Sequence, residues 1–207
     1  MRIARTAVVV ALVVVVAGCA GMRAKPKAMI AREGALTRGE TLQYLGVDFS
    51  RAVFYDPYLR YDDTVHGKIP SWSQHALEDE AVKFPLPLTN DFTTSEQLNK
   101  KVAEKAFVTT TPDAAKLALS DSVLQKELAP YVDKKKSGHA LLIVCEQISK
   151  PAGVVAHYAV FDRRSGEVVL LDQVVGEAGG FGPHNYYLNG LKAVATHARK
   201  NIDALVR

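Results

Sequence analysis

The chain has 207 residues, of which 48% are hydrophobic and 23% charged, a balance typical of a globular protein. This composition excludes collagen-like and wholly disordered chains, and the length favours one domain whose core needs no disulfide or metal. The formal net charge is +4, but no long Lys/Arg stripe is interleaved with aromatic residues, so we expect no nucleic-acid partner.

Residues 1–18 have the three parts of a secretory signal peptide. Arg2 and Arg5 form a basic start, an apolar run from Ala7 to Ala17 follows, and small residues end it. The run is too short for a helix that crosses a bilayer, which takes about 20 residues. We therefore predict a targeting segment. Its removal lowers the net charge from +4 to +2, because the two arginines leave with it.

The sequence Val16-Ala17-Gly18-Cys19 resembles the lipobox of bacterial lipoproteins, in which a cysteine follows a small residue and an aliphatic residue stands three places before it. The resemblance implies cleavage before Cys19, a thioether-linked lipid on it, and palmitate among the acyl chains. More than one acyl chain gives stable anchoring, at about 0.8 kcal/mol per buried methylene. Because Ala20 and not aspartate follows, enterobacterial sorting by analogy implies the periplasmic face of the outer membrane. The alternative is an ordinary signal peptide with a chance cysteine.

Lipidation would leave Cys145 as the only thiol, so no intramolecular disulfide is expected. Residues 19–35 combine the lipidated cysteine with a basic segment that has no clean periodicity, which predicts a flexible tether. The basic residues of this tether suit contact with anionic headgroups and simple solvation equally well. Residues 36–207 are then expected to form a single periplasmic domain.

The domain is predicted to begin with strands. Residues 41–47 alternate, and residues 48–55 are rich in aromatic residues and valine. The polar stretch 58–70 predicts turns. A helix is then expected from Ser71, which can cap it, to Glu80.

The middle of the chain, residues 93–131, predicts helices. Thr94 or Ser95 is the expected cap of a first helix that continues to Ala106. A second start is expected at Thr111-Pro112-Asp113, because proline suits the first helical position and an acid suits the first turn. Pro130 marks the far limit of this helical region.

The last third of the chain predicts three strands and a helix. Residues 140–145, 154–161 and 167–175 are apolar runs of strand length, and Gly166 suits a turn position with positive φ. From Tyr187 to Leu205, apolar residues recur at three- and four-residue spacing, which predicts a helix with one buried face. The expected fold is α/β of the α+β type, with an antiparallel meander and packed helices in two or three layers.

This C-terminal pattern resembles the periplasmic lipoprotein domains related to the TolB N-terminal fold. It comprises a buried strand at 140–148, a strand ending in Phe161-Asp162, the turn at 163–166, a strand from Glu167, and a terminal amphipathic helix. Such domains include lipoprotein activators of peptidoglycan synthases and curli-secretion lipoproteins. The resemblance covers about a third of the chain. It implies helices against a mixed or antiparallel sheet, and partner binding in place of catalysis.

Residues 176–187 form a glycine-rich connection between the last predicted strand and helix. The backbone N–H groups of such a loop can bind an anion at a helix start. However, the glycine spacing matches no phosphate or dinucleotide motif, and Pro183 removes one N–H. We favour a tight connection whose glycines adopt positive φ while Phe181 packs inward. The residues expected to form a ligand or partner surface, if this connection provides one, are Gly179, Gly180, Phe181, His184, Asn185 and Tyr186.

The sequence does not indicate a metal or catalytic site. No two histidines share one helical face, and the pair of His75 and Glu78 is typical of a solvated surface. His157 alternates with apolar neighbours and is expected on a sheet face. Cys145 ends an apolar run, where burial raises a thiol pKa and makes it inert. We expect no metal, no cofactor and no enzymatic activity.

Two functions remain open from the sequence. The first is a lipid-anchored, non-enzymatic module of the cell envelope that binds a protein partner or associates with itself. The second is a small-molecule or anion-binding lipoprotein, or an enzyme, that uses residues 176–187. Tyr55, Tyr58 and Tyr61 recur every three residues around Pro57, and they suit either an interface or the cover of a sheet edge.

Overall fold

The structure is a computed structural model that describes residues 30–78, 83–110 and 121–207. Residues 30–35, the end of the predicted tether 19–35, are described, and Ile30 and Ala31 form a strand of the sheet in place of a flexible segment. The predicted signal peptide, the lipidation of Cys19, residues 19–29 of the predicted tether and the helix start at Thr111 lie outside the described ranges. They therefore stay predictions.

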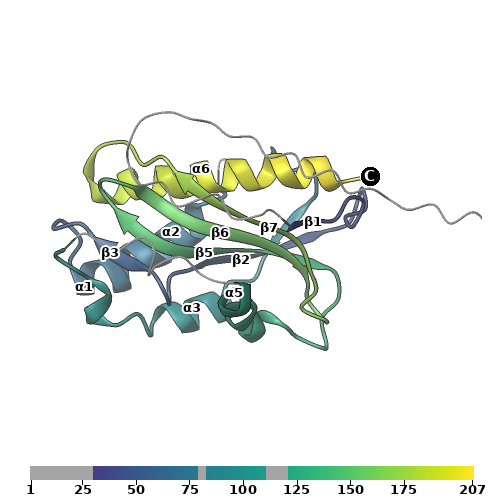
Figure 1. Ribbon diagram of the computed structural model, residues 1–207, viewed down its shortest axis with the longest axis horizontal. Coiled ribbons are helices and arrows are strands. Elements are labelled where there is room, and N and C mark those ends of the chain that lie inside the picture. The colour runs from purple at the N-terminus through teal and green to yellow at the C-terminus, as the bar shows by residue number, and fades with distance from the viewer. Residues whose placement is uncertain (1–29, 79–82, 111–120) are drawn as a thin grey trace, which may run out of the picture.

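A mixed sheet of seven strands lies at the centre of the described domain (Figure 1). Its spatial order is β1-β7-β6-β5-β2-β4, with β3 also beside β5. The pairs β5–β6 and β6–β7 are antiparallel, which confirms the predicted meander, while β2 and β3 run parallel to β5. The strands are β1 (Ile30–Ala31), β2 (Leu42–Asp48), β3 (Val53–Tyr55), β4 (Leu88–Asn90), β5 (His139–Ser149), β6 (Gly153–Asp162) and β7 (Val168–Gly176).

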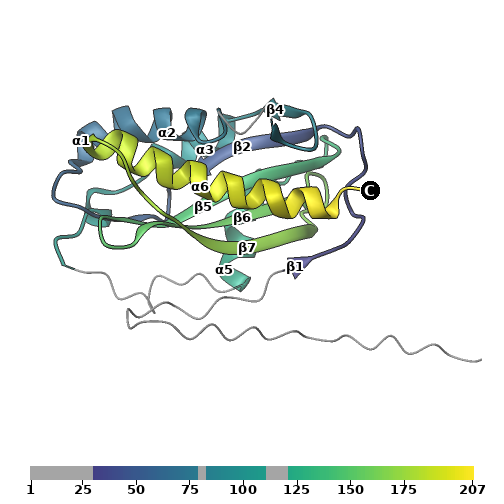
Figure 2. The same ribbon diagram turned by 90° about the horizontal axis from the view of Figure 1, so that it is seen from above.

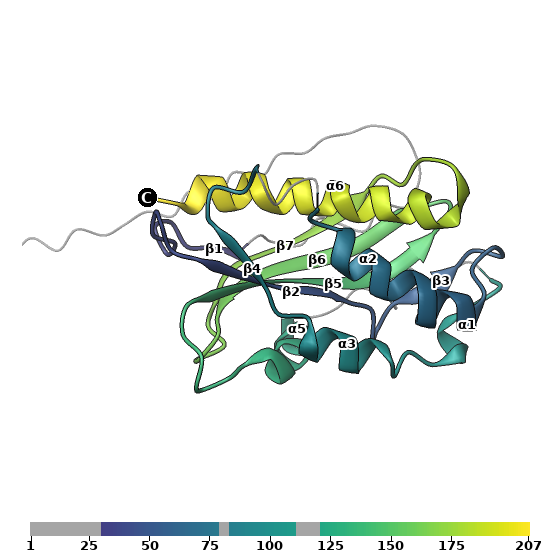
Figure 3. The ribbon, with the colours of Figure 1, turned by 180° about the vertical axis from the view of Figure 1, so that it is seen from behind.

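Helices cover both faces of the sheet, so the domain has three layers (Figures 1 and 3). The long helix α6 and the shorter α2 pack on one face, and α3 and α5 lie on the other. This arrangement confirms the predicted α+β fold. The α-helices are α1 (Tyr61–Asp63), α2 (Ile69–His75), α3 (Thr93–Asn99), α5 (Asp121–Leu128) and α6 (Gly182–Leu205), with a π-helical turn η1 (Thr64–Lys68) and 3-10 turns η3 (Glu104–Ala106) and η4 (Ala129–Tyr131).

The larger core lies between α6, α2 and the sheet. Fully burying one large apolar side chain contributes about 1.5–3 kcal/mol, so the apolar stripe of α6 fixes the helix on β6 and β7. The predicted spacing is confirmed, with Leu188 only partly buried. The buried residues of α6 are Tyr187, Gly190, Leu191, Val194, Ala195, Ala198, Ile202 and Leu205.

The second core, on the other sheet face, is smaller. Leu124, Leu128 and Tyr131 from α5 and η4 pack over Leu142 and Phe161 of the meander. No helix in the described ranges is both long and apolar enough to span a membrane.

The predicted strand at 48–55 is only partly correct. β2 ends at Asp48 and β3 covers only Val53–Tyr55. The Asp48 carboxylate accepts the N–H of Ser50 at 2.8 Å, and this side-chain bond starts a turn that interrupts the extended chain.

The prediction of turns over residues 58–70 is wrong from Tyr61 onward, where the chain is helical through α1, η1 and α2. Asp62 and Asp63 suit the first turn, while Val65 and Ile69 are buried. Pro70 directly follows the π-helical turn η1, so the proline, which has no N–H, lies where the i→i−4 hydrogen-bond pattern is already interrupted.

The first helix predicted within residues 93–131 ends at Asn99 and does not continue to Ala106. The predicted caps, Thr94 and Ser95, lie inside the helix, because it begins at Thr93 with Phe92 in the N-cap position. The Asn99 amide donates to Val47 C=O at 2.8 Å and accepts the Phe49 N–H at 2.7 Å. Asn99 therefore serves the backbone at the end of β2, and the chain leaves the helix after it.

Candidate functional site

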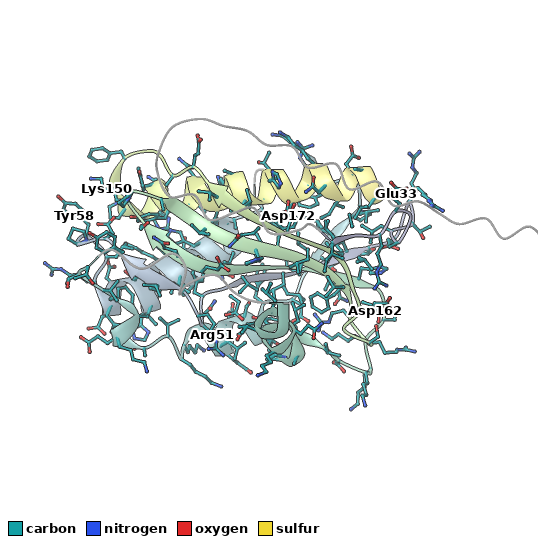
Figure 4. The ribbon with its side chains drawn as sticks, viewed as in Figure 1. Glu33, Arg51, Tyr58, Lys150, Asp162 and Asp172 are labelled. Carbon is teal, nitrogen blue, oxygen red and sulfur yellow. The ribbon has the colours of Figure 1, made fainter. Side chains whose placement is uncertain are left out.

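One end of the sheet gathers three connections and the first turn of α6. The connections are residues 56–60 after β3, the turn 150–152 between β5 and β6, and the loop 177–181 before α6. Figure 4 shows Tyr58 and Lys150 at this end and Glu33, near the start of the described chain, at the opposite end. The candidate residues of the glycine-rich connection lie here.

Phe181 is 96% exposed, so the expectation that it packs inward is wrong. It is the N-cap of α6, with extended φ and ψ, because the helix begins at Gly182 and not at Tyr187. The positive φ expected of the glycines is found at Gly180 and Gly182, on either side of it. These two glycines turn the chain sharply, and the phenyl ring is left in solvent.

The loop 177–181 is closed by its own hydrogen bonds. The Gly179 N–H donates to Tyr186 C=O at 3.1 Å, and the Asn189 amide donates to Gly179 C=O at 2.8 Å. The Asn185 amide also reaches Phe181 C=O, at 3.4 Å. These hydrogen bonds restrain the backbone on either side of Phe181. The loop therefore loses less conformational entropy when Phe181 contacts another molecule.

Tyr186 links this loop to the other connections. Its hydroxyl donates to Lys150 C=O at 3.4 Å. The Lys150 ammonium lies 5.5 Å from the ring centroid of Tyr58, which is 67% exposed, in a cation–π arrangement. We call Tyr58, Lys150, Phe181 and Tyr186 the aromatic end face.

Buried contacts support the aromatic end face from below. The Tyr187 hydroxyl donates to the Asp56 carboxylate, and burial together with this bond raises the pKa of Tyr187. The same carboxylate accepts the Tyr58 N–H at 2.8 Å. Asp56 therefore joins the first turn of α6 to the loop that carries Tyr58.

His184 lies elsewhere in the first turn of α6, against α2. Its ring stacks on Trp72, with centroids 6.3 Å apart, and its C=O accepts the Trp72 indole N–H at 3.0 Å. Burial, followed by the charges of Lys68 and His75, lowers the pKa of His184. A neutral imidazole held in this way does not attract an anion.

The residues of the anion-binding alternative do not line one common pocket in the described part of the structure. Gly179, Gly180 and Asn185 form the hydrogen-bonded loop, Phe181 and Tyr186 belong to the aromatic end face, and His184 packs on Trp72. Two surface cavities of the described chain, of about 510 and 240 Å³, are lined by other residues. Among the residues that the structure describes, no three His, Cys, Asp or Glu side chains are placed to hold a metal ion.

Tyr58 and Tyr61, two of the three tyrosines that recur around Pro57, have different surroundings in the structure. Tyr58 is exposed, whereas the Tyr61 hydroxyl donates to Val102 C=O at 3.2 Å and its ring packs edge-on against Phe107. Tyr61 is therefore part of the packing, and Tyr58 is the member available to another molecule.

A polar network that the sequence analysis missed joins α6 to β7. The Asp172 carboxylate accepts the Tyr158 hydroxyl and the His197 ring N–H, each at 3.1 Å, and the Asn201 amide at 3.3 Å. Burial and Asp172 raise the pKa of Tyr158, which keeps the hydroxyl protonated and donating. These residues are distant in sequence, and no local spacing could reveal the network.

A second missed cluster lies on the opposite sheet face. His157 is buried on that face, as predicted, and its Nδ1 lies 2.8 Å from a Glu146 carboxylate oxygen. The Gln173 amide donates to the other oxygen at 2.6 Å. The ladder shifts register between Cys145 and Gln147, so Glu146 has no directly opposed residue on β6. Val144 lies opposite His157, and Glu146 follows it two residues later on the same face.

The thiol of Cys145 is fully buried, and burial raises its pKa, as expected for an inert cysteine. The predicted surface pair is also found. His75 Nδ1 lies 2.8 Å from a Glu78 carboxylate oxygen, and both side chains are exposed.

No family model matches the chain, and no curated protein sequence matches it. Two solved structures of PelC dodecamers from Paraburkholderia phytofirmans show some similarity. One, a point variant, is 15% identical over 87% of this chain and 100% of its own, with a TM-score of 0.36. The other is 14% identical over 87% of this chain and 98% of its own, with a TM-score of 0.28. TM-scores this low do not define a common fold.

Proposed function

We propose that this chain is a lipid-anchored protein of the bacterial cell envelope, which binds a protein partner through the aromatic end face and has no catalytic role. The observation that carries the proposal is the almost complete exposure of Phe181, at 96%, on a backbone tied by hydrogen bonds. A large apolar ring costs free energy in water, so its display favours a binding role.

The composition of the aromatic end face supports a protein partner. Aromatic side chains are enriched at the centres of protein interfaces, because they bury much area and have few rotamers. Phe181 and Tyr58 are exposed, Tyr186 is partly buried, and Lys150 adds a charge beside the rings. This pattern is typical of a small hot spot with a polar rim.

The position of the aromatic end face also supports the proposal. Glu33, near the end of the predicted tether 19–35, lies at the opposite end of the domain from Tyr58 and Lys150 (Figure 4). A lipid on Cys19 would hold the Glu33 end nearer the membrane. The aromatic end face would then point away from the anchoring leaflet, toward other envelope proteins.

Photo-crosslinking in intact cells tests the partner proposal. A benzoylphenylalanine at position 181 should form a covalent adduct with one defined protein, identified by mass spectrometry. The same group at Asp203, which is exposed near the C-terminal end of α6, is the matched control. Phe181→Ala should leave the melting temperature within about 1 °C, since the ring makes no buried contact, and should reduce co-purification of that protein at least tenfold. Equal adducts at both positions would refute the proposal.

The anchor is tested separately. Cys19→Ser should move the protein from the membrane fraction to the soluble fraction, because the variant lacks the thioether lipid. Tight membrane association of this variant would contradict lipid anchoring, whatever the outcome at Phe181.

A further inference from the structure

The outer edge of β7 is only partly covered in the described chain. β1 pairs with Leu170 and Leu171 alone, and among the described residues no strand lies beside Asp172–Gly176 on that side. Figure 2 shows β7 at the border of the sheet, with β1 at one end of it. An uncovered edge presents backbone N–H and C=O groups to any strand that approaches.

The ladder fixes which backbone groups point outward. The Arg32 N–H donates to Val169 C=O at 2.9 Å across this edge. Successive residues of a strand direct their backbone groups to alternate sides. The outward groups beyond Leu171 are therefore those of Gln173 and Val175.

The edge is also nearly free of outward charge. Asp172, its acidic residue, is turned toward Tyr158 and His197. Its second oxygen accepts the Gln173 N–H at 2.9 Å, so that donor is satisfied locally. Val175 is 55% exposed, and no described strand pairs with its backbone on the outer side of β7. Edge strands that avoid pairing usually carry lysine or another outward charge here, and this one does not.

We infer that β7 pairs with β7 of a second copy of this chain, antiparallel and around a two-fold axis at Val175. Each Val175 N–H then donates to the C=O of its counterpart, and the two exposed valine side chains meet on one face. This inference goes beyond the proposed function, because it concerns the outer edge of β7 and not the aromatic end face.

The register around Val175 makes the edge self-complementary, as a two-fold interface requires. Gln173 faces Glu177 of the other copy, and Val174 faces Gly176, so no like charges lie opposite each other. The Gln173 N–H remains with Asp172, and the pairing needs only its C=O. This two-fold match is available only to a second copy of the chain, because a strand of another protein would present a different set of residues to β7.

Disulfide trapping in the full chain in its native membranes tests this pairing. Directly opposed, hydrogen-bonded residues have Cα atoms about 5.5 Å apart, within the range that a disulfide spans. Val175→Cys should therefore give a covalent homodimer on mild oxidation, at least tenfold above Thr89→Cys. Thr89 is the matched control because it is exposed on β4, at the other edge of the sheet. The unsubstituted chain reports any dimer formed through Cys19, since Cys145 is buried.

A charge variant gives the second measurement. Val175→Lys should abolish the dimer in detergent-solubilised protein, measured by sedimentation, while the melting temperature of the exposed-site variant changes by no more than about 1 °C. Equal trapping at positions 175 and 89, or trapping of a different protein at position 175, would overturn the pairing. If the adduct at position 181 survives that result, the proposed function stands and only the β7 pairing fails.

Discussion

The contact between Gly176 and Gly190 offers a sharp test of how α6 is fixed to the sheet. Gly176 ends β7, and Gly190 lies on the buried face of α6. A Cβ built on Gly176 would lie 2.0 Å from the Gly190 C=O oxygen and 2.9 Å from a methyl of Val194. The strand end and the helix therefore touch backbone to backbone, and Gly176→Ala inserts a methyl group where none fits.

The size of the effect follows from this distance. A carbon and a carbonyl oxygen approach to about 3.3 Å at closest, so α6 must move by more than about 1 Å. Overpacking costs about 1–3 kcal/mol and occasionally more. We expect about 3 kcal/mol, because the obstacle is backbone and cannot rotate away. At about 2–4 °C per kcal/mol for a domain of this size, the melting temperature should fall by about 6–12 °C.

Thermal unfolding followed by circular dichroism measures the change, with Gly179→Ala as the control. A Cβ at Gly179 meets no atom within 4 Å, and its φ is outside the left-handed region. Alanine there should be neutral or stabilise by about 0.4–1 kcal/mol through the unfolded chain. If Gly176→Ala melts together with Gly179→Ala, then α6 is not held at the distance described, and the reasoning is refuted.

Two further predictions concern charged side chains. The hydrogen bond from Lys136 holds the pKa of Asp91 below its ordinary value, and the buried guanidinium of Arg163 lies 3.5 Å away. Asp91→Asn should cost about 1–2 kcal/mol at pH 7 in urea unfolding, and the difference should vanish as the pH falls through the folded pKa, below about 3.9. An equal loss at pH 2.5 would contradict this linkage. Tyr187→Phe should cost about 1.5–3 kcal/mol, because it leaves one oxygen of the buried Asp56 carboxylate without its donor, while the other oxygen keeps the Tyr58 N–H. Urea unfolding unchanged from the wild-type chain would disprove that role.

Sequence patterns within one element were enough to predict the strands and the helix that pack against a broad apolar surface. The runs at 140–145, 154–161 and 167–175 became β5, β6 and β7, and the three- and four-residue spacing after Tyr187 became the buried face of α6. The turn between β6 and β7 is equally local, since Gly166 has a φ of +76°. β5 and β6 are buried along most of their length and are near-continuous apolar runs in the sequence, while the buried residues of α6 recur every three or four positions. Each pattern lies within the element itself, so the sequence alone carries the information.

Elements that depend on one distant hydrogen bond were not predictable in this way. α3 ends at Asn99 because its side chain serves the backbone of β2, about fifty residues earlier. The cluster of Glu146 and His157 includes Gln173 of β7, which is 27 residues from Glu146 in the sequence. Nothing in the neighbouring residues of either position specifies its partner.

The candidate site shows the same division. The sequence by itself identified residues 179–186 as a candidate surface, because glycines between a strand and a helix indicate a sharp connection. Only the tertiary structure decided that Phe181 faces solvent, that His184 lies on Trp72, and that Tyr186 reaches Lys150. The physical reason is that these orientations depend on where α6 begins, and the packing of Tyr187 and Gly190 against the sheet fixes that start.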